Sequence, residues 1–296
     1  MELLVRHQTV YRYPSAAARV AMRVKLMPVD TPTQTVRDWQ VSINGQPLTD
    51  FHRDSFGELE AVWVRHDYLD HAAVVAEGLV ETRDNHGIAG PREEQVHPAY
   101  FLRSTRLTGP SPEIVAMARA VPEDGGALAR LHALSAAVSD NVAYRAGVTG
   151  ADTTAAQAFA LGAGVCQDHA QVFIAAARAI GVPARYVTGY LLAEGEDALH
   201  ETHGWAEALV PDLGWVGFDP SNRVCVTERY LRVVSGLDAD EAAPIRGSVT
   251  VAGDIRIDAD VRIAQAHGGS EERQLQRQQQ QQRQRRVPAV RSSGQQ

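Results

Sequence analysis

A cysteine near the middle of the chain stands where a thiol could be activated for chemistry. Cys166 follows Gly162 and Gly164, and apolar or small residues then recur at helical spacing as far as Ile180. We therefore predict a helix with Cys166 in its first turn. Unpaired backbone N–H groups and the positive end of the helix dipole favour an anion there. The same features suit a thiolate nucleophile and could hold the oxyanion of a tetrahedral intermediate.

A base and an acid follow on segments that are expected to be strands. The alternating runs 184–192, 203–210 and 215–220 predict three strands, with a turn over 211–214. His203 begins the second strand and Asp219 closes the third. An odd number of loop residues would place the two side chains on one face as diagonal neighbours, roughly 7–8 Å apart at Cα. An even number would place them on opposite faces, so the hypothesis requires the odd register.

The order of nucleophile, base and acid predicts acyl transfer through a cysteine thioester. Cys166 is the expected nucleophile, His203 its base and Asp219 the group that orients the base. An amine acceptor would give transamidation and water would give hydrolysis, and the sequence leaves this choice open. Trp205 shares the face of His203 and either walls the substrate groove or packs in the core.

Several blocks in this order resemble the bacterial transglutaminase-like superfamily. The resemblance covers roughly residues 1–260 and includes the N-terminal Tyr11-Arg12-Tyr13-Pro14 opening. It implies a papain-like α+β core with a Cys-His-Asp triad, and a β-rich region before it. Gly204 is a departure, because relatives more often carry Ala there. The blocks are Gly164-Val165-Cys166-Gln167-Asp168, Gly181-Val182-Pro183-Ala184-Arg185, His203-Gly204-Trp205-Ala206-Glu207 and Gly214-Trp215-Val216-Gly217-Phe218-Asp219-Pro220-Ser221-Asn222.

Two other interpretations of the same residues stay open at this point. The pairs Cys166/His169 and His200/His203 offer one thiolate and three imidazoles, a ligand set that zinc accepts. Against zinc, His200 lies in an acidic loop and no second cysteine pair supports it. The fold could also serve as a non-catalytic binding module with an inert core cysteine. The favoured interpretation needs no metal and no cofactor, and no calcium-binding loop pattern is present.

Composition agrees with a soluble enzyme of a reducing compartment. The 296 residues contain two cysteines, Cys166 and Cys225, and suggest no disulfide framework. No run of apolar residues is long enough to be a signal peptide or a membrane span, so we expect a cytoplasmic protein. The formal net charge is −7, and the basic tail makes the rest more acidic still. We expect a protein, peptide or amide substrate rather than nucleic acid or membrane, and nothing predicts the oligomeric state.

The pattern along the chain predicts an α+β protein in three parts. Residues 1–105 alternate and should form an antiparallel β-sandwich. Residues 106–266 should form the catalytic core, in which the cysteine-bearing helix packs on an antiparallel sheet; helices are expected over 112–121 and 127–141. Residues 267–296 are rich in Gln and Arg and should be disordered. Within these parts, 84–91 is expected to be a loop, 248–264 to be closing strands, and Asp152 or Thr153 to cap a helix.

Overall fold

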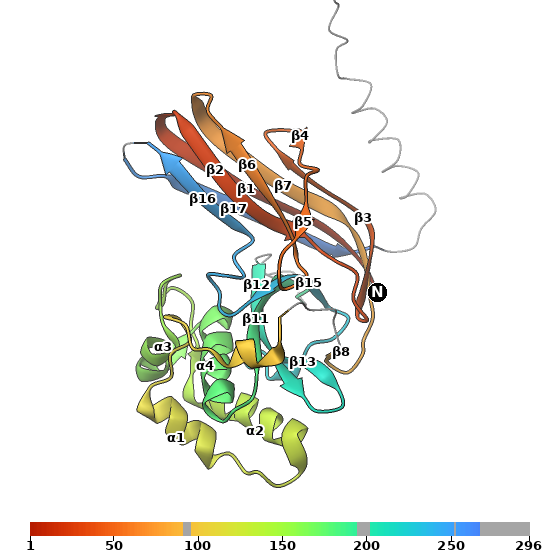
Figure 1. The fold of residues 1–296 in the computed structure, drawn as a ribbon, viewed down its shortest axis with the longest axis vertical. Helices are drawn as coiled ribbons and strands as arrows, with labels where there is room; N and C mark the ends of the chain where they lie inside the picture. Colours follow the sequence, from red (N-terminus) through yellow and green to blue (C-terminus); the bar gives the residue numbers. More distant parts are fainter. Residues whose placement is uncertain (91–95, 194–201, 252, 267–296) are drawn as a thin grey trace, which may run out of the picture. The chain divides into compact units, whose positions relative to one another are not determined.

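Alternating strands in the first part of the chain form a two-layer β-sandwich, as predicted (Figure 1). The structure, a computed structural model, describes residues 1–90, 96–193, 202–251 and 253–266. In order across the sheets, the first sheet contains β17 (Arg256–Gln265), β1 (Glu2–Ala17), β7 (Leu69–Thr82), β3 (Gln34–Ile43) and β4 (Gln46–Pro47), and the second contains β16 (Ile245–Thr250), β2 (Arg19–Met27), β6 (Leu59–Arg65) and β5 (His52–Arg53).

The core of the sandwich comes from the inward-facing residue of each alternating pair. Val20, Met22 and Val24 on one sheet are buried against Val74 and Ala76 on the other. Because side chains of a strand point alternately to its two faces, one apolar residue in two is enough to fill the space between the sheets.

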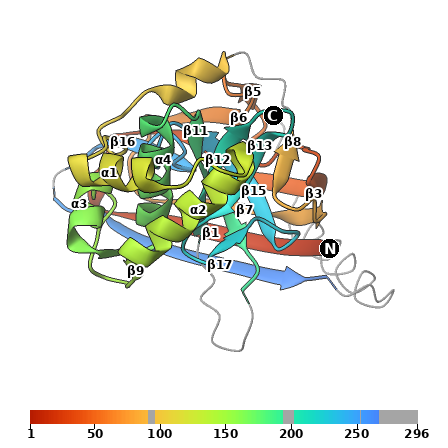
Figure 2. The same ribbon diagram turned by 90° about the horizontal axis from the view of Figure 1, so that it is seen from below.

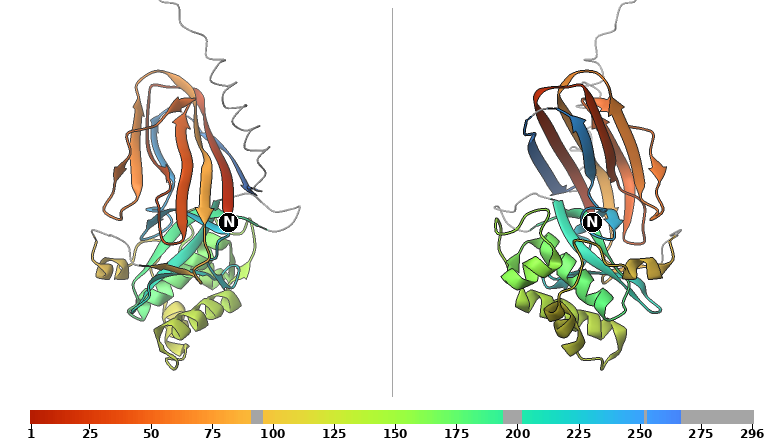
Figure 3. Two further views of the ribbon diagram at one scale, coloured as in Figure 1. Left: turned by 90° about the vertical axis from the view of Figure 1, so that its right-hand side faces the viewer. Right: turned by 60° about the vertical axis from the view of Figure 1, so that its left-hand side comes forward.

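The last strands of the chain belong to this sandwich and not to the catalytic core. β17 pairs with β1 and β16 pairs with β2, both antiparallel. Figure 3 shows these blue strands beside the red strands that begin the chain. The prediction of closing strands was right in kind, but the boundary of the core at 266 does not follow the strand pairing. Residues 1–265 form one compact unit; the tail prediction for 267–296 lies outside the described residues.

The chain between the two pieces of the sandwich contains an antiparallel sheet of its own. Its strands, in order, are β14 (Val224–Cys225), β13 (Gly214–Asp219), β12 (Thr202–Val210), β11 (Ala184–Leu191) and β15 (Tyr230–Gly236). A short strand, β8 (Ile88–Gly90), pairs with β13. This corrects the prediction of a loop over 84–91: three of its residues find a partner strand more than a hundred positions away, which local composition cannot indicate.

Helices gather on one face of this sheet (Figure 2). They are α1 (Pro112–Ala120), α2 (Gly126–Asn141), α3 (Ala155–Leu161) and α4 (Cys166–Ala179), preceded by a 3₁₀ helix η1 (Pro98–Leu102). The side chain of Thr154 caps α3 and accepts a hydrogen bond from the N–H of Gln157. The predicted caps, Asp152 and Thr153, were one or two residues too early.

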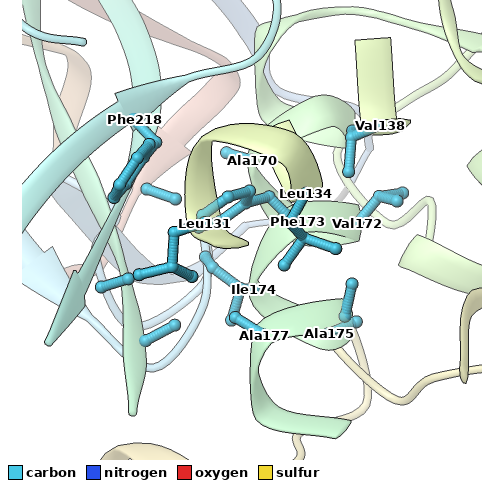
Figure 4. Packing of buried hydrophobic residues seen from close by; sticks show 14 of the residues in the cluster. Leu131, Leu134, Val138, Ala170, Val172, Phe173, Ile174, Ala175, Ala177 and Phe218 are labelled. Carbon is cyan, nitrogen blue, oxygen red and sulfur yellow. The ribbon is translucent and has the colours of Figure 1, made fainter. Parts of the chain in front are cut away.

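α4 is buried on nearly every side, because the sheet covers one face and the other three helices cover the rest. Figure 4 shows Phe173 of α4 beside Phe218 of β13, and their ring centroids are 5.2 Å apart. Leu131 and Leu134 of α2 pack against the same cluster. A helix enclosed in this way has little freedom to shift, so the residue at its N-terminus is held firmly.

A buried ionic network joins the sandwich to the sheet of β11, β12 and β15. Glu58 precedes β6 and receives two hydrogen bonds from the guanidinium of Arg232 on β15, at 2.6 and 3.1 Å. The Nε of Arg232 also contacts Glu207 on β12, which pairs with Arg185 on β11. All four side chains are at least 95 % buried. The sandwich and this sheet therefore bury charged side chains that pair with one another across the joint.

Candidate active site

Cys166 is the first residue of α4, as the helical pattern predicted. It follows β10 (Ala163–Gly164), which runs parallel to β9 (Ala143–Tyr144). The side chain of Asp168 accepts a hydrogen bond from the backbone N–H of Val165 at 2.8 Å and so caps the start of the helix. The N–H groups of Cys166 and Gln167 find no acceptor among the described residues. They are therefore free to bind a negative charge beside the sulfur.

His203 and Asp219 meet across a hairpin in the register that the hypothesis required. β12 and β13 pair from Ala206 opposite Phe218 to Val210 opposite Gly214, which leaves three loop residues. This odd loop directs His203 and Asp219 to the same face, and His203 Nε2 lies 2.6 Å from Asp219 Oδ2. Since Asp219 occupies Nε2, Nδ1 is the nitrogen left for the thiol.

Asp219 is fully buried and surrounded by donors. Its Oδ1 accepts the N–H and hydroxyl of Ser221 and the N–H of Asn222, at 3.0, 2.6 and 3.3 Å. Its Oδ2 accepts the side-chain amide of Asn222 and the hydroxyl of Tyr230, at 2.7 and 2.8 Å, besides His203. A carboxylate with this many donors is held as an anion in one orientation.

The pKa values of the pair move apart as expected for an ion pair. Burial acts most strongly on His203 and would lower its pKa, but the hydrogen bonds and charges of Asp219 and Cys166 outweigh it and raise the pKa to about 10. Burial would raise the pKa of Asp219, and the bonds from His203, Ser221 and Asn222 lower it to about 2. Cys166 is among the groups that raise the pKa of His203.

Trp205 lies under His203. The two rings are nearly parallel, with centroids 6.2 Å apart, and the indole also packs edge-on against Tyr230. Only 2 % of Trp205 is exposed. This burial agrees with the packing alternative better than with a wall of an open groove. Its Nε1 has no partner among the described residues.

The zinc alternative does not fit the position of His169. Its Nδ1 lies 2.9 Å from the carbonyl oxygen of Val165 and its Nε2 lies 2.7 Å from that of Val142. Both ring nitrogens are thus engaged with the backbone, and neither can ligate a metal beside Cys166. His200, the other proposed ligand, lies outside the described residues. No cluster of three or more metal-ligating side chains occurs in the part of the chain that the structure describes.

Sequence reasoning assigned no role to three groups that hold Asp219. Ser221 and Asn222 stand in the recognised block after Pro220, so their place beside the acid was a usable signal. Tyr230 lies eleven residues after Asp219, at the start of β15, and no local pattern connects the two. Only the order of strands in the sheet brings its hydroxyl there.

Two separate stretches of the chain match known families. Residues 115–220 match the transglutaminase-like superfamily, and residues 3–81 match the bacterial transglutaminase-like N-terminal region. The chain belongs to the transglutaminase-like superfamily. The stretch 3–81 covers most of the sandwich, and the stretch 115–220 runs from within α1 to Pro220.

Two of the curated relatives are uncharacterized mycobacterial proteins. An uncharacterized protein of Mycobacterium leprae is 34% identical over 127 residues, which are 41% of this chain and 45% of that protein. One of Mycobacterium tuberculosis is 35% identical over 129 residues, which are 40% of this chain and 41% of that protein. The matches span less than half the length of these relatives.

A solved structure extends the likeness of fold to nearly the whole chain. A candidate cysteine protease from Cytophaga hutchinsonii superposes with a TM-score of 0.71 and covers 91% of this chain and 92% of its own. The sequences are 19% identical, so the likeness concerns the fold of this transglutaminase-like protein. In the described part of this chain, no helix is both long enough and apolar enough to cross a membrane.

Proposed function

We propose that this protein is a thiol enzyme that cleaves or transfers acyl groups of amide or peptide substrates through a thioester on Cys166. The observation that carries the proposal is the 2.6 Å hydrogen bond between His203 and the buried Asp219, together with the place of Cys166 as the first residue of a buried helix. Cys166 is also among the groups that raise the pKa of His203. A charged imidazole beside the thiol stabilises the thiolate, and Asp219 stabilises the charged imidazole.

The proposed reaction has two halves. In the first, Cys166 Sγ attacks the carbonyl carbon, and the electron pair of the C=O bond moves to oxygen. The oxyanion then collapses, the C–N bond breaks, and His203 gives its proton to the leaving amine. In the second half, His203 takes a proton from the acceptor as the acceptor attacks the thioester carbon. The second oxyanion collapses, the C–S bond breaks, and the Cys166 thiolate is released beside the charged imidazole.

Water is the acceptor that the surroundings favour. A transamidase must keep water from the thioester with apolar walls over the sulfur. Trp205, the sequence's candidate for such a wall, packs beneath His203 with 2 % of its surface exposed. We therefore infer peptide or amide hydrolysis as the main reaction, with amine transfer as the alternative. A reducing cytoplasm, where we expect the protein, would keep both cysteines reduced.

Alkylation by iodoacetamide tests the activated thiol, and Cys225 is its internal control. Burial raises the pKa of Cys225, so this thiol should react slowly at neutral pH. We expect Cys166 to be alkylated faster than Cys225 at neutral pH, as followed by mass spectrometry, and to lose this advantage in His203→Ala. Equal rates at Cys166 and Cys225 would contradict the proposal.

The acyl-transfer step is tested with peptide amides, each assayed with and without a fluorescent primary amine. Cys166→Ala should abolish every product. A hydrolysed peptide in both conditions identifies a peptidase or amidase, and incorporation of the amine identifies a transamidase. Full activity in Cys166→Ala would end the covalent mechanism.

A further inference from the structure

Tyr186 on β11 carries a buried hydroxyl that the mechanism above does not use. Its ring lies in the apolar cluster between the sheet and α4, beside Ala170 and Ala206, and 4 % of the residue is exposed. The hydroxyl makes no hydrogen bond to any residue that the structure describes. A phenol buried this far nearly always has a partner, because losing its bond to water is costly.

The hydroxyl lies at the start of β12, next to His203. A Cβ atom on Gly204 would stand 1.8 Å from Tyr186 Oη, so the oxygen fills the space that a side chain at 204 would take. This contact explains the glycine at a position where the family resemblance implies Ala. It also places Oη at the end of the sheet that faces the N-terminus of α4.

The pKa of the Tyr186 hydroxyl is affected by three ionisable residues of the site. Burial chiefly, and then the charges of Cys166, Asp168 and Asp219, raise the pKa of Tyr186 well above its ordinary value. This agrees with the place of Oη against Gly204, the residue after His203 at the start of β12. A phenol in this field keeps its proton and can act only as a neutral donor.

Nearby acceptors do not use this donor. Asp168 Oδ2 accepts the N–H of Val165 and the hydroxyl of Thr149, and Asp168 Oδ1 has no partner among the described residues. Asp219 takes its phenolic hydrogen bond from Tyr230 instead. Among the described residues, no acceptor takes the proton of Tyr186, and it can be donated to an acceptor that arrives with the substrate.

We propose that the Tyr186 hydroxyl and the backbone N–H of Cys166 together hold the oxyanion that forms when Cys166 is acylated. The inference rests on the proposed function. The oxygen of the attacked carbonyl becomes negative beside Sγ, between the helix N-terminus and the beginning of β12. Tyr186 gives a hydrogen bond there and transfers no proton. It acts as a catalytic residue because it touches the reacting oxygen only when charge develops.

The test compares two reactions of the same thiol in Tyr186→Phe. Acylation by p-nitrophenyl acetate passes through an oxyanion, and its burst of nitrophenol measures the rate. Alkylation by iodoacetamide forms no oxyanion. We expect acylation of Cys166 to slow by about 100-fold or more, with the alkylation rate unchanged.

Tyr190→Phe is the matched control, since this tyrosine lies on the same strand and its hydroxyl bonds to His7 at 2.8 Å, on the sandwich. It should leave both rates unchanged. Thermal melting of both variants shows that they are folded.

The outcomes separate this inference from the function on which it rests. If the wild type gives no burst at Cys166, the proposed function fails and the inference fails with it. If the wild type reacts and Tyr186→Phe acylates equally fast, the inference alone is overturned. Equal losses in acylation and alkylation would show that Tyr186 acts on the thiolate, and this would also overturn the oxyanion role.

Discussion

Asp219 determines the charge state of the site through the hydrogen bonds that it accepts. Six bonds, three to each oxygen, hold it as an anion. Its pKa is lowered to about 2, so its stabilising effect is complete above pH 4 and disappears as the pH falls through 2. The pKa of His203 is raised to about 10, so its contribution is complete below pH 6 and disappears as the pH rises through 10. The ion pair therefore persists between about pH 4 and pH 9.

Replacing Asp219 with Asn should shift this window. The amide keeps the shape but removes the charge that outweighs burial, so the pKa of His203 should fall from about 10 towards or below its ordinary value. At pH 8 the imidazole should then be neutral, and acylation of Cys166 should slow by more than tenfold. The pH dependence of the imidazole NMR signals measures the change.

His7 is an internal reference for that titration. Burial lowers its pKa to about 4, and its ring bonds to Tyr190 and Thr9 far from Asp219. Its signals should be the same in the wild type and in Asp219→Asn. An unchanged midpoint for His203 would show that Asp219 does not hold the charged imidazole.

At the level of elements, the sequence predicted the hairpin of β12 and β13 but did not predict which strands lie beside it. Periodicity and turn residues predicted α4, β12 and β13, and the odd loop followed from the requirement that His203 and Asp219 share a face. The positions of Tyr186 and Tyr230 could not be predicted in this way. The Tyr186 hydroxyl depends on the pairing of β11 with β12 and on the missing side chain at Gly204. The Tyr230 hydroxyl depends on the pairing of β15 with β11.

Gly189 shows how closely those elements approach. A Cβ there would lie 2.1 Å from the carbonyl oxygen of Leu231 on β15 and 2.6 Å from the Trp205 ring. Gly189→Ala must move a backbone or the indole under His203. We expect a loss of about 3 kcal/mol in unfolding free energy and slower acylation, measured by urea unfolding and by the nitrophenol burst.

Gly247→Ala is the control for a strand glycine. On β16 the nearest atom to an added Cβ is 3.8 Å away, and the site is distant. This variant should keep the stability and acylation rate of the wild type. A Gly189→Ala protein as stable as Gly247→Ala would show that β11 and β15 can separate without cost.

For the molecule as a whole, the chain folds back on itself. The sandwich is begun by β1 and β2 and completed by β16 and β17, so the catalytic part is inserted between two pieces of one sandwich. The sequence predicted the alternation of 248–264 but not its partners, because all edge strands of this kind look alike locally. The buried apolar cluster of Leu3, Val80, Tyr190 and Leu231 crosses the same joint. We therefore expect residues 1–265 to unfold in one cooperative transition.

Glu58→Gln tests whether the ionic network sustains that cooperativity. The change keeps the size of the side chain but leaves the charge of Arg232 without the carboxylate that faces it at 2.6 and 3.1 Å. Removing one partner of a buried pair costs about 3–5 kcal/mol, because the remaining charge stays away from water. The exposed pair Arg223–Asp140 is the matched control, and Asp140→Asn should cost less than about 1 kcal/mol. Urea unfolding should show a larger loss of unfolding free energy in Glu58→Gln than in Asp140→Asn. If the network couples the sandwich and the core, the unfolding of Glu58→Gln should also split into two transitions. Equal losses in the two variants would mean that the apolar cluster alone joins the layers.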